Sequence, residues 1–165
     1  MELDEYRLKI AETLSKNQSV STSKQQIYLH QLYGGILNYS SGTPILDIAF
    51  PEINTYCEYN GGGHKLKVTF GILSEKEFRN KELRRYHYLK DMGWKAIFID
   101  SDDDLLPSDE ILQEIKSMAL KYLETENWIK FDINNNMIIS KNIKINYDYG
   151  KLRKIKNKDL EKEVG

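Results

Sequence analysis

The sequence predicts one globular fold of the mixed α/β or α+β class. Three observations support this: apolar residues recur at helical spacing in some segments, short apolar β-rich runs fill others, and two capping-box patterns mark helix starts. With 40% hydrophobic residues and three prolines, the composition excludes disordered, collagen-like and mucin-like chains. A chain of 165 residues buries enough surface to fold without a staple, so any metal would be functional.

The first part of the chain predicts a helical appendage, a helix and a meander of strands. Residues 1–20 carry apolar residues at helical spacing, and the polar stretch 16–23 separates them from the next helix. Ser23 and Gln26 form a capping box, which predicts that this helix begins there and ends at the Gly34 turn. Prolines and glycines punctuate short extended runs that predict an antiparallel meander. These runs cover 36–39, 45–50 and 53–59, with a further candidate strand at 66–70.

Helices and strands alternate in the next part. Ser74 and Glu77 form a second capping box, which predicts a helix that stops at Gly93. The apolar run 94–99 predicts a buried strand, and an amphipathic pattern predicts a third helix that starts at Ser108. Grouped strands followed by a helix that crosses over to another strand describe an α/β or α+β sandwich.

The sequence divides into three parts. An N-terminal helical appendage covers 1–20, and a core covers 21–125. From 126 to 165 the pattern changes to short alternating stretches around an asparagine run, which predict a small β appendage with a basic, frayed end.

Cysteine content and apolar run length bear on location. Cys57 is the sole cysteine, so no internal disulfide can form, and a reducing cytoplasmic compartment is expected. No apolar run approaches the roughly 20 residues that span a bilayer, and the N-terminus lacks a leader-like apolar region. We expect no membrane partner.

Charge is segregated along the chain although its totals balance to a net −1. Residues 100–126 carry nine acids against two lysines, whereas 65–95 carry nine bases against four acids and 141–158 carry seven bases against one acid. The two basic stretches predict a surface that contacts phosphates. For the C-terminal stretch alone, a solvated lysine-rich face is an equally good interpretation.

Two acidic residues lie on neighbouring predicted strands. An even-length loop around 51–54 places Asp47 opposite Glu58, where like charges about 5 Å apart at Cβ repel. A divalent cation, a bridging base or protonation of one carboxyl would make this pair tolerable. An oxygen-only pair suits a hard ion such as Mg²⁺, which takes one or two carboxylates plus substrate phosphate. An odd register, with Glu58 facing away from Asp47, is the structural alternative.

The residues after Glu58 add candidate groups. Asn60 shares the strand face of Glu58, and the triple glycine beyond it allows close backbone approach or positive φ before His64. His64 could activate water or donate a proton near neutral pH, and Lys65 and Lys67 could stabilise a pentavalent phosphate. Otherwise His64 is a simple loop residue.

A glutamate and an arginine interrupt the apolar stripe of the 74–92 helix. Glu82 and Arg85 are costly there unless they pair with each other or reach a polar site. One interpretation is a surface pair at i,i+3. In the other, Arg85 contacts phosphate or orients the acidic cluster.

Together these residues resemble a known superfamily. Asp47, then Glu58-Tyr59-Asn60-Gly61 with His64, then Glu82 and Arg85, then Gly93-Trp94 opening a strand, resemble in order and spacing the PD-(D/E)XK nucleases. The nearest branch is the one of very-short-patch-repair-like and small phage homing endonucleases. The resemblance covers roughly residues 23 to 123.

The resemblance implies a restriction-endonuclease-like αβββαβ core and a site. Asp47, Glu58 and the Tyr59 carbonyl would hold Mg²⁺, or Mn²⁺ in its place, with His64 catalytic and Arg85 aimed at the site. Two departures from the family pattern stand out. Asn60 replaces the motif lysine, so its role passes to His64, Lys65 or Lys67 or is lost. The acidic residue of the first core helix is replaced by Gln25 or Gln26.

We therefore predict a magnesium-dependent, DNA-binding endonuclease, a hydrolase that cuts or nicks a phosphodiester bond in repair or homing. Basic residues would bind backbone phosphates without reading sequence, and a single-site enzyme cuts both strands by forming a homodimer or by acting twice. The proposed nucleic-acid contacts are Lys81, Arg84, Lys151, Arg153, Lys154, Lys156 and Lys158. Two alternatives are a nuclease-like domain that binds nucleic acid or protein without cutting, and a protein-interaction module built on the N-terminal helix.

Overall fold

The computed structural model describes residues 22–42, 44–62 and 75–160. Its first elements are α2 (Lys24–Tyr33), β1 (Ile36–Ser40), β2 (Ile45–Phe50), the 3₁₀ turn η1 (Pro51–Ile53), β3 (Thr55–Asn60), α4 (Glu75–Asp91) and β4 (Lys95–Asp100). The later elements are β5 (Leu105–Leu106), α5 (Asp109–Tyr122), β6 (Trp128–Asp132), β7 (Met137–Ile139), β8 (Lys144–Asn146), β9 (Arg153–Lys154) and η2 (Asn157–Leu160).

The described residues form a mixed α+β fold, as the sequence predicts, with three helices and a seven-stranded sheet. The predicted order of helix, three strands, helix, strand and helix is confirmed, and element ends differ from the predictions by two residues or fewer. The predicted helix within 1–20 and the strand over 66–70 lie outside the described residues. Within them, no helix combines the length and apolarity that a membrane crossing requires.

The sheet has the order β1-β2-β3-β4-β6-β7-β8. Strands β1, β2 and β3 form the predicted antiparallel meander, β3 runs parallel to β4 and β4 parallel to β6, and β7 and β8 return antiparallel. The sheet therefore continues across the boundary predicted at 125–126, because β6 pairs directly with β4. The three-part division of the chain stays a prediction.

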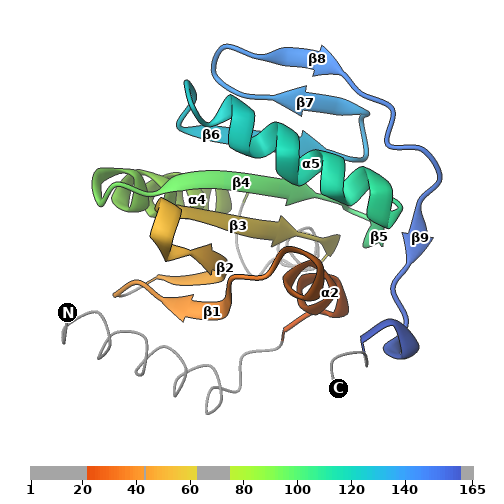
Figure 1. Ribbon diagram of the computed structural model, residues 1–165. Helices are drawn as coiled ribbons and strands as arrows, with labels where there is room; N and C mark the ends of the chain where they lie inside the picture. Colours follow the sequence, from red (N-terminus) through yellow and green to blue (C-terminus); the bar gives the residue numbers. More distant parts are fainter. Residues whose placement is uncertain (1–21, 43, 63–74, 161–165) are drawn as a thin grey trace.

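Helices cover both faces of the sheet. In Figure 1, α5 crosses the near face and α4 lies behind the sheet. Leu29 of α2 and Ile115 of α5 pack with Ile97 of β4 in the larger hydrophobic cluster. On the opposite face, Leu89 of α4 packs in a smaller cluster with Tyr56 of β3. Asp47, Glu58 and Arg85, three of the candidate site residues, come from β2, β3 and α4.

The C-terminal segment is packed against the core. Strand β9 pairs with β5, and Tyr149 and Ile155 are each 1% exposed. The side-chain amide of Gln31 in α2 donates to the carbonyl of Leu160 at 2.8 Å. The prediction of a frayed end is therefore wrong up to Leu160, because buried apolar side chains and main-chain pairing fix this segment.

A candidate carboxylate site between β2 and β3

The pairing of β2 with β3 confirms the even register that the sequence predicts. Ile48 pairs with Cys57, Ala49 with Tyr56, and Phe50 with Thr55. The main-chain pairing ends at Ile48 and Cys57, and the next two residues in the same register are Asp47 and Glu58, which we call the carboxylate pair. The alternative odd register, with Glu58 facing away from Asp47, is excluded.

The carboxylate pair interrupts the main-chain ladder between the two strands. The Asp47 N–H donates to Glu58 Oε2 at 3.0 Å, and the Tyr59 N–H donates to Asp47 Oδ2 at 2.9 Å. Each carboxylate thus accepts a backbone N–H from the neighbouring strand where a carbonyl would otherwise stand. The two acidic groups are held together by the sheet itself.

Arg85 of α4 completes the contacts of Glu58. Its guanidinium forms an ion pair with Glu58 Oε1, approaches Glu58 Oε2 at 3.3 Å, and also donates to the Ile45 carbonyl. Arg85 therefore reaches the acidic cluster and is more than a surface partner of Glu82. Glu82, one turn earlier on α4, adds a negative charge that acts on both carboxyl groups and on Arg85.

Burial makes charge costly at this site. Glu58 is 6% exposed, and burial raises its pKa while the charge and hydrogen bonds of Arg85 oppose that rise. The pKa of Asp47 is raised well above its usual range, first by burial and then by the charge of Glu58. One guanidinium therefore offsets one carboxylate, and Asp47 is left as the group that most resists ionisation.

Gln26 fixes the backbone at Asp47. Its side-chain amide donates to Asn38 Oδ1 at 2.9 Å and to the Asp47 carbonyl at 3.2 Å. The predicted N-cap is confirmed, since Ser23 Oγ accepts from the Gln26 N–H at 3.1 Å, but the Gln26 side chain points to the site instead. Asn38, opposite Asp47 in β1, has φ of 51°, a sparsely populated region for a non-glycine residue. Helical spacing alone did not predict this role.

Asn60 stands where the family motif has lysine, and its side chain is engaged. Its amide donates to Asp100 Oδ1 at 2.8 Å, across the parallel pairing of β3 with β4. Lys130 of β6 lies 3.6 Å from Asp100 Oδ2. Burial raises the pKa of Asp100, and the charge of Lys130 opposes that rise. Neither Asp100 nor Lys130 was a candidate from the sequence, because their proximity depends on strand order.

The glycines after Asn60 allow close approach. A Cβ on Gly61 would stand 2.0 Å from Asp104 Oδ1, the atom that accepts from the Tyr59 hydroxyl at 2.6 Å. The Gly62 N–H also donates to this carboxylate, at 3.2 Å. Of the two uses predicted for these glycines, close approach is the one seen at Gly61. His64, Lys65 and Lys67 lie outside the described residues.

Most of the candidate nucleic-acid contacts are exposed, and Arg153 is half-buried. Lys81 and Arg84 are exposed on α4. Arg153 is engaged, because it forms an ion pair with Asp109 and donates to the Tyr28 hydroxyl at 3.0 Å. The remaining candidates are exposed on the C-terminal segment: Lys151, Lys154, Lys156 and Lys158.

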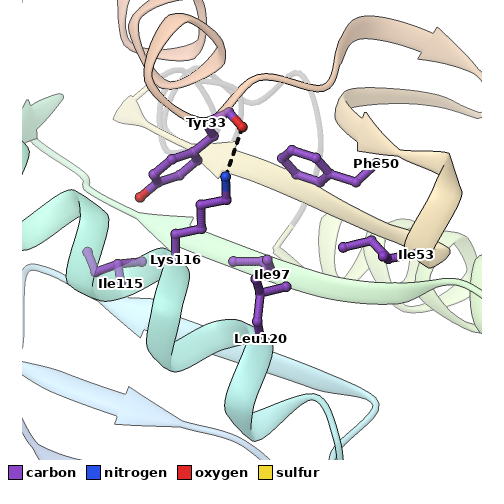
Figure 2. Close-up of a pocket in the computed structure, with 7 residues that line it drawn as sticks. All are labelled: Tyr33, Phe50, Ile53, Ile97, Ile115, Lys116 and Leu120. Carbon is purple, nitrogen blue, oxygen red and sulfur yellow. Dashed lines mark hydrogen bonds between the residues drawn. The ribbon is translucent and has the colours of Figure 1, made fainter.

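A small pocket lies on the other side of the molecule, between α5 and the sheet (Figure 2). Apolar side chains line it, together with Lys116, whose Nζ donates to the Tyr33 carbonyl at 3.1 Å. The ammonium also sits 5.8 Å from the ring centre of Tyr33 and 5.9 Å from that of Phe50, within range of cation–π attraction. No acidic side chain lines the pocket within the described part of the chain. We therefore interpret it as a gap in the packing of the core, not as a binding site.

The carboxylate pair fits a hard cation in its chemistry. Both side chains offer oxygen, and Mg²⁺ commonly takes one or two protein carboxylates. Asp47, with its raised pKa, is a group whose charge a cation would neutralise. Among the described residues no set of three or more histidine, cysteine or acidic side chains surrounds a common point, so the pair would act without a third such ligand from this part of the chain.

Comparison with known proteins adds nothing to this geometry. No protein-family model, curated protein or solved structure matches the chain.

Proposed function

We propose that this protein is a metal-dependent endonuclease that hydrolyses or nicks phosphodiester bonds in DNA. The observation that supports the proposal is the carboxylate pair. Asp47 and Glu58 lie together in the predicted register, and each accepts a main-chain N–H of the neighbouring strand. One more positive charge would be needed to balance both carboxylates. A fold with no ligand has little reason to bury two facing acids, since like charges directly opposed in a sheet are destabilising.

The order of elements supports the proposed restriction-endonuclease-like core. Helix α2 precedes the meander β1–β3, α4 comes next, and β4 then pairs in parallel with β3. This order matches the αβββαβ arrangement that the resemblance to PD-(D/E)XK nucleases implies. Asp47 lies on β2 and Glu58 on β3, and these are the two acids to which the resemblance assigns the metal.

Each residue has a proposed task. Asp47, Glu58 and the Tyr59 carbonyl would hold Mg²⁺ or Mn²⁺, which supplies Lewis-acid activation of water and of the phosphate. Gln26 and the Tyr59 N–H keep Asp47 in place. His64 would move the proton of the attacking water, and Lys65 and Lys67 would balance charge on the phosphate.

The exposed bases would bind the DNA backbone. Lys81 and Arg84 on α4 are exposed, as are lysines of the C-terminal segment, whereas Arg153 is held in an ion pair. A truncation of residues 151–165 is a poor test of this role, because it also removes the buried Ile155. Replacing Lys151, Lys154 and Lys156 by glutamine should weaken DNA binding and reduce its salt dependence, measured by fluorescence anisotropy. If the salt dependence of DNA affinity does not change, these lysines do not contact the DNA backbone.

Plasmid cleavage tests the enzymatic proposal. The purified chain should convert supercoiled plasmid to nicked or linear DNA with Mg²⁺ or Mn²⁺ and fail with EDTA. Asp47→Asn and Asp47→Ala should lower the rate by about 100-fold or more, because a lost metal ligand removes several kcal/mol of transition-state stabilisation. Asp91→Asn, an exposed change at the end of α4, is the matched control. Equal cleavage by the Asp47 variants would refute the site.

A second function has a specific observation in its favour. Arg85 already neutralises Glu58, and the residue at the motif lysine position, Asn60, is bonded to Asp100. These contacts favour a nuclease-like domain that binds nucleic acid or a protein without cutting. Such a domain would shift DNA in a salt-dependent way and leave the plasmid intact at every metal concentration.

A further inference from the structure

Arg85 occupies the coordination positions of Glu58. Its guanidinium meets both carboxylate oxygens, and the Asp47 N–H is a third donor on Oε2. A carboxylate has about four lone-pair sites, and the arrangement uses three of them. One lone-pair site is left, so a cation that binds both oxygens of Glu58 must take the position of the guanidinium.

Charge makes simultaneous occupancy unfavourable. A divalent ion on Glu58 would lie beside a guanidinium that is itself largely buried, with 22% of its side chain exposed. Repulsion between two cations is strong where water is scarce. Arginine cannot relieve the repulsion by losing its proton.

A second anionic partner for Arg85 lies on the same helix. Glu82 lies one turn earlier on α4, at i,i−3, and its charge already acts on Arg85. Residues at this spacing are neighbours on a helix surface. The side chain can therefore leave Glu58 without losing every anionic partner.

We infer that Arg85 is the resident counter-ion of the carboxylate pair and competes with the divalent cation for Glu58. Without metal it offsets the charge of Glu58. When a cation binds, Arg85 moves off Glu58 towards Glu82, where its guanidinium can meet an anionic phosphate of the substrate. This inference rests on the proposed function, since it concerns the same cation.

Manganese binding tests the competition directly. Titration of the full chain with Mn²⁺, followed by calorimetry or by the EPR signal of free Mn²⁺, should give about tenfold tighter binding for Arg85→Gln than for the wild type, because one like charge is removed from beside the ion. Arg85→Lys keeps the charge but loses the two-pronged contact, so its affinity should fall between the two. Lys90→Gln, an exposed change of equal charge on α4, should bind as the wild type does.

Thermal melting gives an independent readout. In EDTA, Arg85→Gln should melt below the wild type, and saturating Mn²⁺ should raise its melting temperature by more than it raises that of the wild type. If Arg85→Gln does not fold, Arg85→Lys carries both measurements.

The outcomes separate the two proposals. If the wild type binds Mn²⁺ and cleaves plasmid, but neither Arg85 variant binds the ion more tightly, the competition is wrong and the nuclease proposal stands. If no variant binds Mn²⁺, and Asp47→Asn changes nothing, both proposals are wrong. Tighter binding in both variants without plasmid cleavage supports the competition and refutes the nuclease.

Discussion

Two buried glutamates in this molecule are satisfied in opposite ways. Glu58 is 6% exposed and Glu126 is 7% exposed. Glu126, between α5 and β6, accepts from the Ser140 hydroxyl at 2.8 Å and from the N–H of Asn142 at 3.1 Å. Hydrogen bonds from the Asn142 side-chain amide, the Ser140 hydroxyl and the Asn142 N–H lower the pKa of Glu126, whereas burial raises that of Glu58.

The difference separates a structural acid from a candidate functional one. Neutral donors around Glu126 tie the loop between β7 and β8 to the start of β6. Glu58 instead faces Asp47 and depends on one arginine for its balance. Buried charges of the second kind add little to stability and are retained for another reason. Here we propose that the reason is cation binding.

The largest expected effect comes from removing the counter-ion without metal. Arg85→Leu in EDTA should lower the free energy of unfolding by about 3 kcal/mol, since breaking a buried ion pair leaves a carboxylate without compensation. Urea denaturation measures this loss. Lys90→Ala on the same helix should change stability by less than about 0.5 kcal/mol. If Arg85→Leu also lost less than about 0.5 kcal/mol, Glu58 would not depend on Arg85 to compensate its charge.

Removing one acid of the carboxylate pair should have the opposite sign. Asp47→Asn keeps an acceptor for the Tyr59 N–H and removes a like charge, so in EDTA at pH 7 it should stabilise the fold by about 1 kcal/mol. Because the folded-state pKa of Asp47 is raised, the wild type is penalised above that pKa and relieved as pH falls through it. The advantage of the variant should vanish below about pH 4, where free aspartate is also protonated. A destabilised variant at pH 7 would contradict this account.

The smallest expected effect is at Glu126. Glu126→Gln should destabilise the fold at pH 7 by less than Arg85→Leu, since amide and hydroxyl donors still find one oxygen. The lowered pKa means that the contribution of Glu126 is present above the pKa of free glutamate and is lost as pH falls through its folded-state value. The variant and the wild type should therefore converge in acid, and Mn²⁺ binding should not change. A changed Mn²⁺ affinity in Glu126→Gln would contradict the distinction between Glu126 as a structural acid and Glu58 as a candidate functional one.

Much of the fold could be predicted from local patterns. The 53–59 run, the proline turn and the 45–50 run set the hairpin register, because turn length decides which residues face each other. Ser23 caps its helix as expected, through a bond from the Gln26 N–H, and the third helix starts at Ser108 as expected, where the Ser108 hydroxyl accepts from the Ile111 N–H. The role of β6 could not be predicted, because its pairing with β4 joins segments that a helix separates.

The candidate site divides in the same way. Asp47 and Glu58 could be paired from their spacing, and Arg85 could be singled out as a charge within an apolar stripe. Gln26 and Asn38 could not, since the bonds of Gln26 to Asn38 and to Asp47 depend on how α2 packs across the meander. Asn60 likewise meets Asp100, and Asp100 meets Lys130, only because three parallel strands lie side by side.

The return of the C-terminal segment to α2 has a consequence for how the chain assembles. Strands β2 and β3, which carry the carboxylate pair, are complete at Asn60. Gln31 bonds to Leu160, which follows Gln31 by 129 positions. Closing so long a span is entropically slow compared with forming a hairpin. During translation, the proposed metal-binding half can therefore be in place well before the first helix receives its last partner.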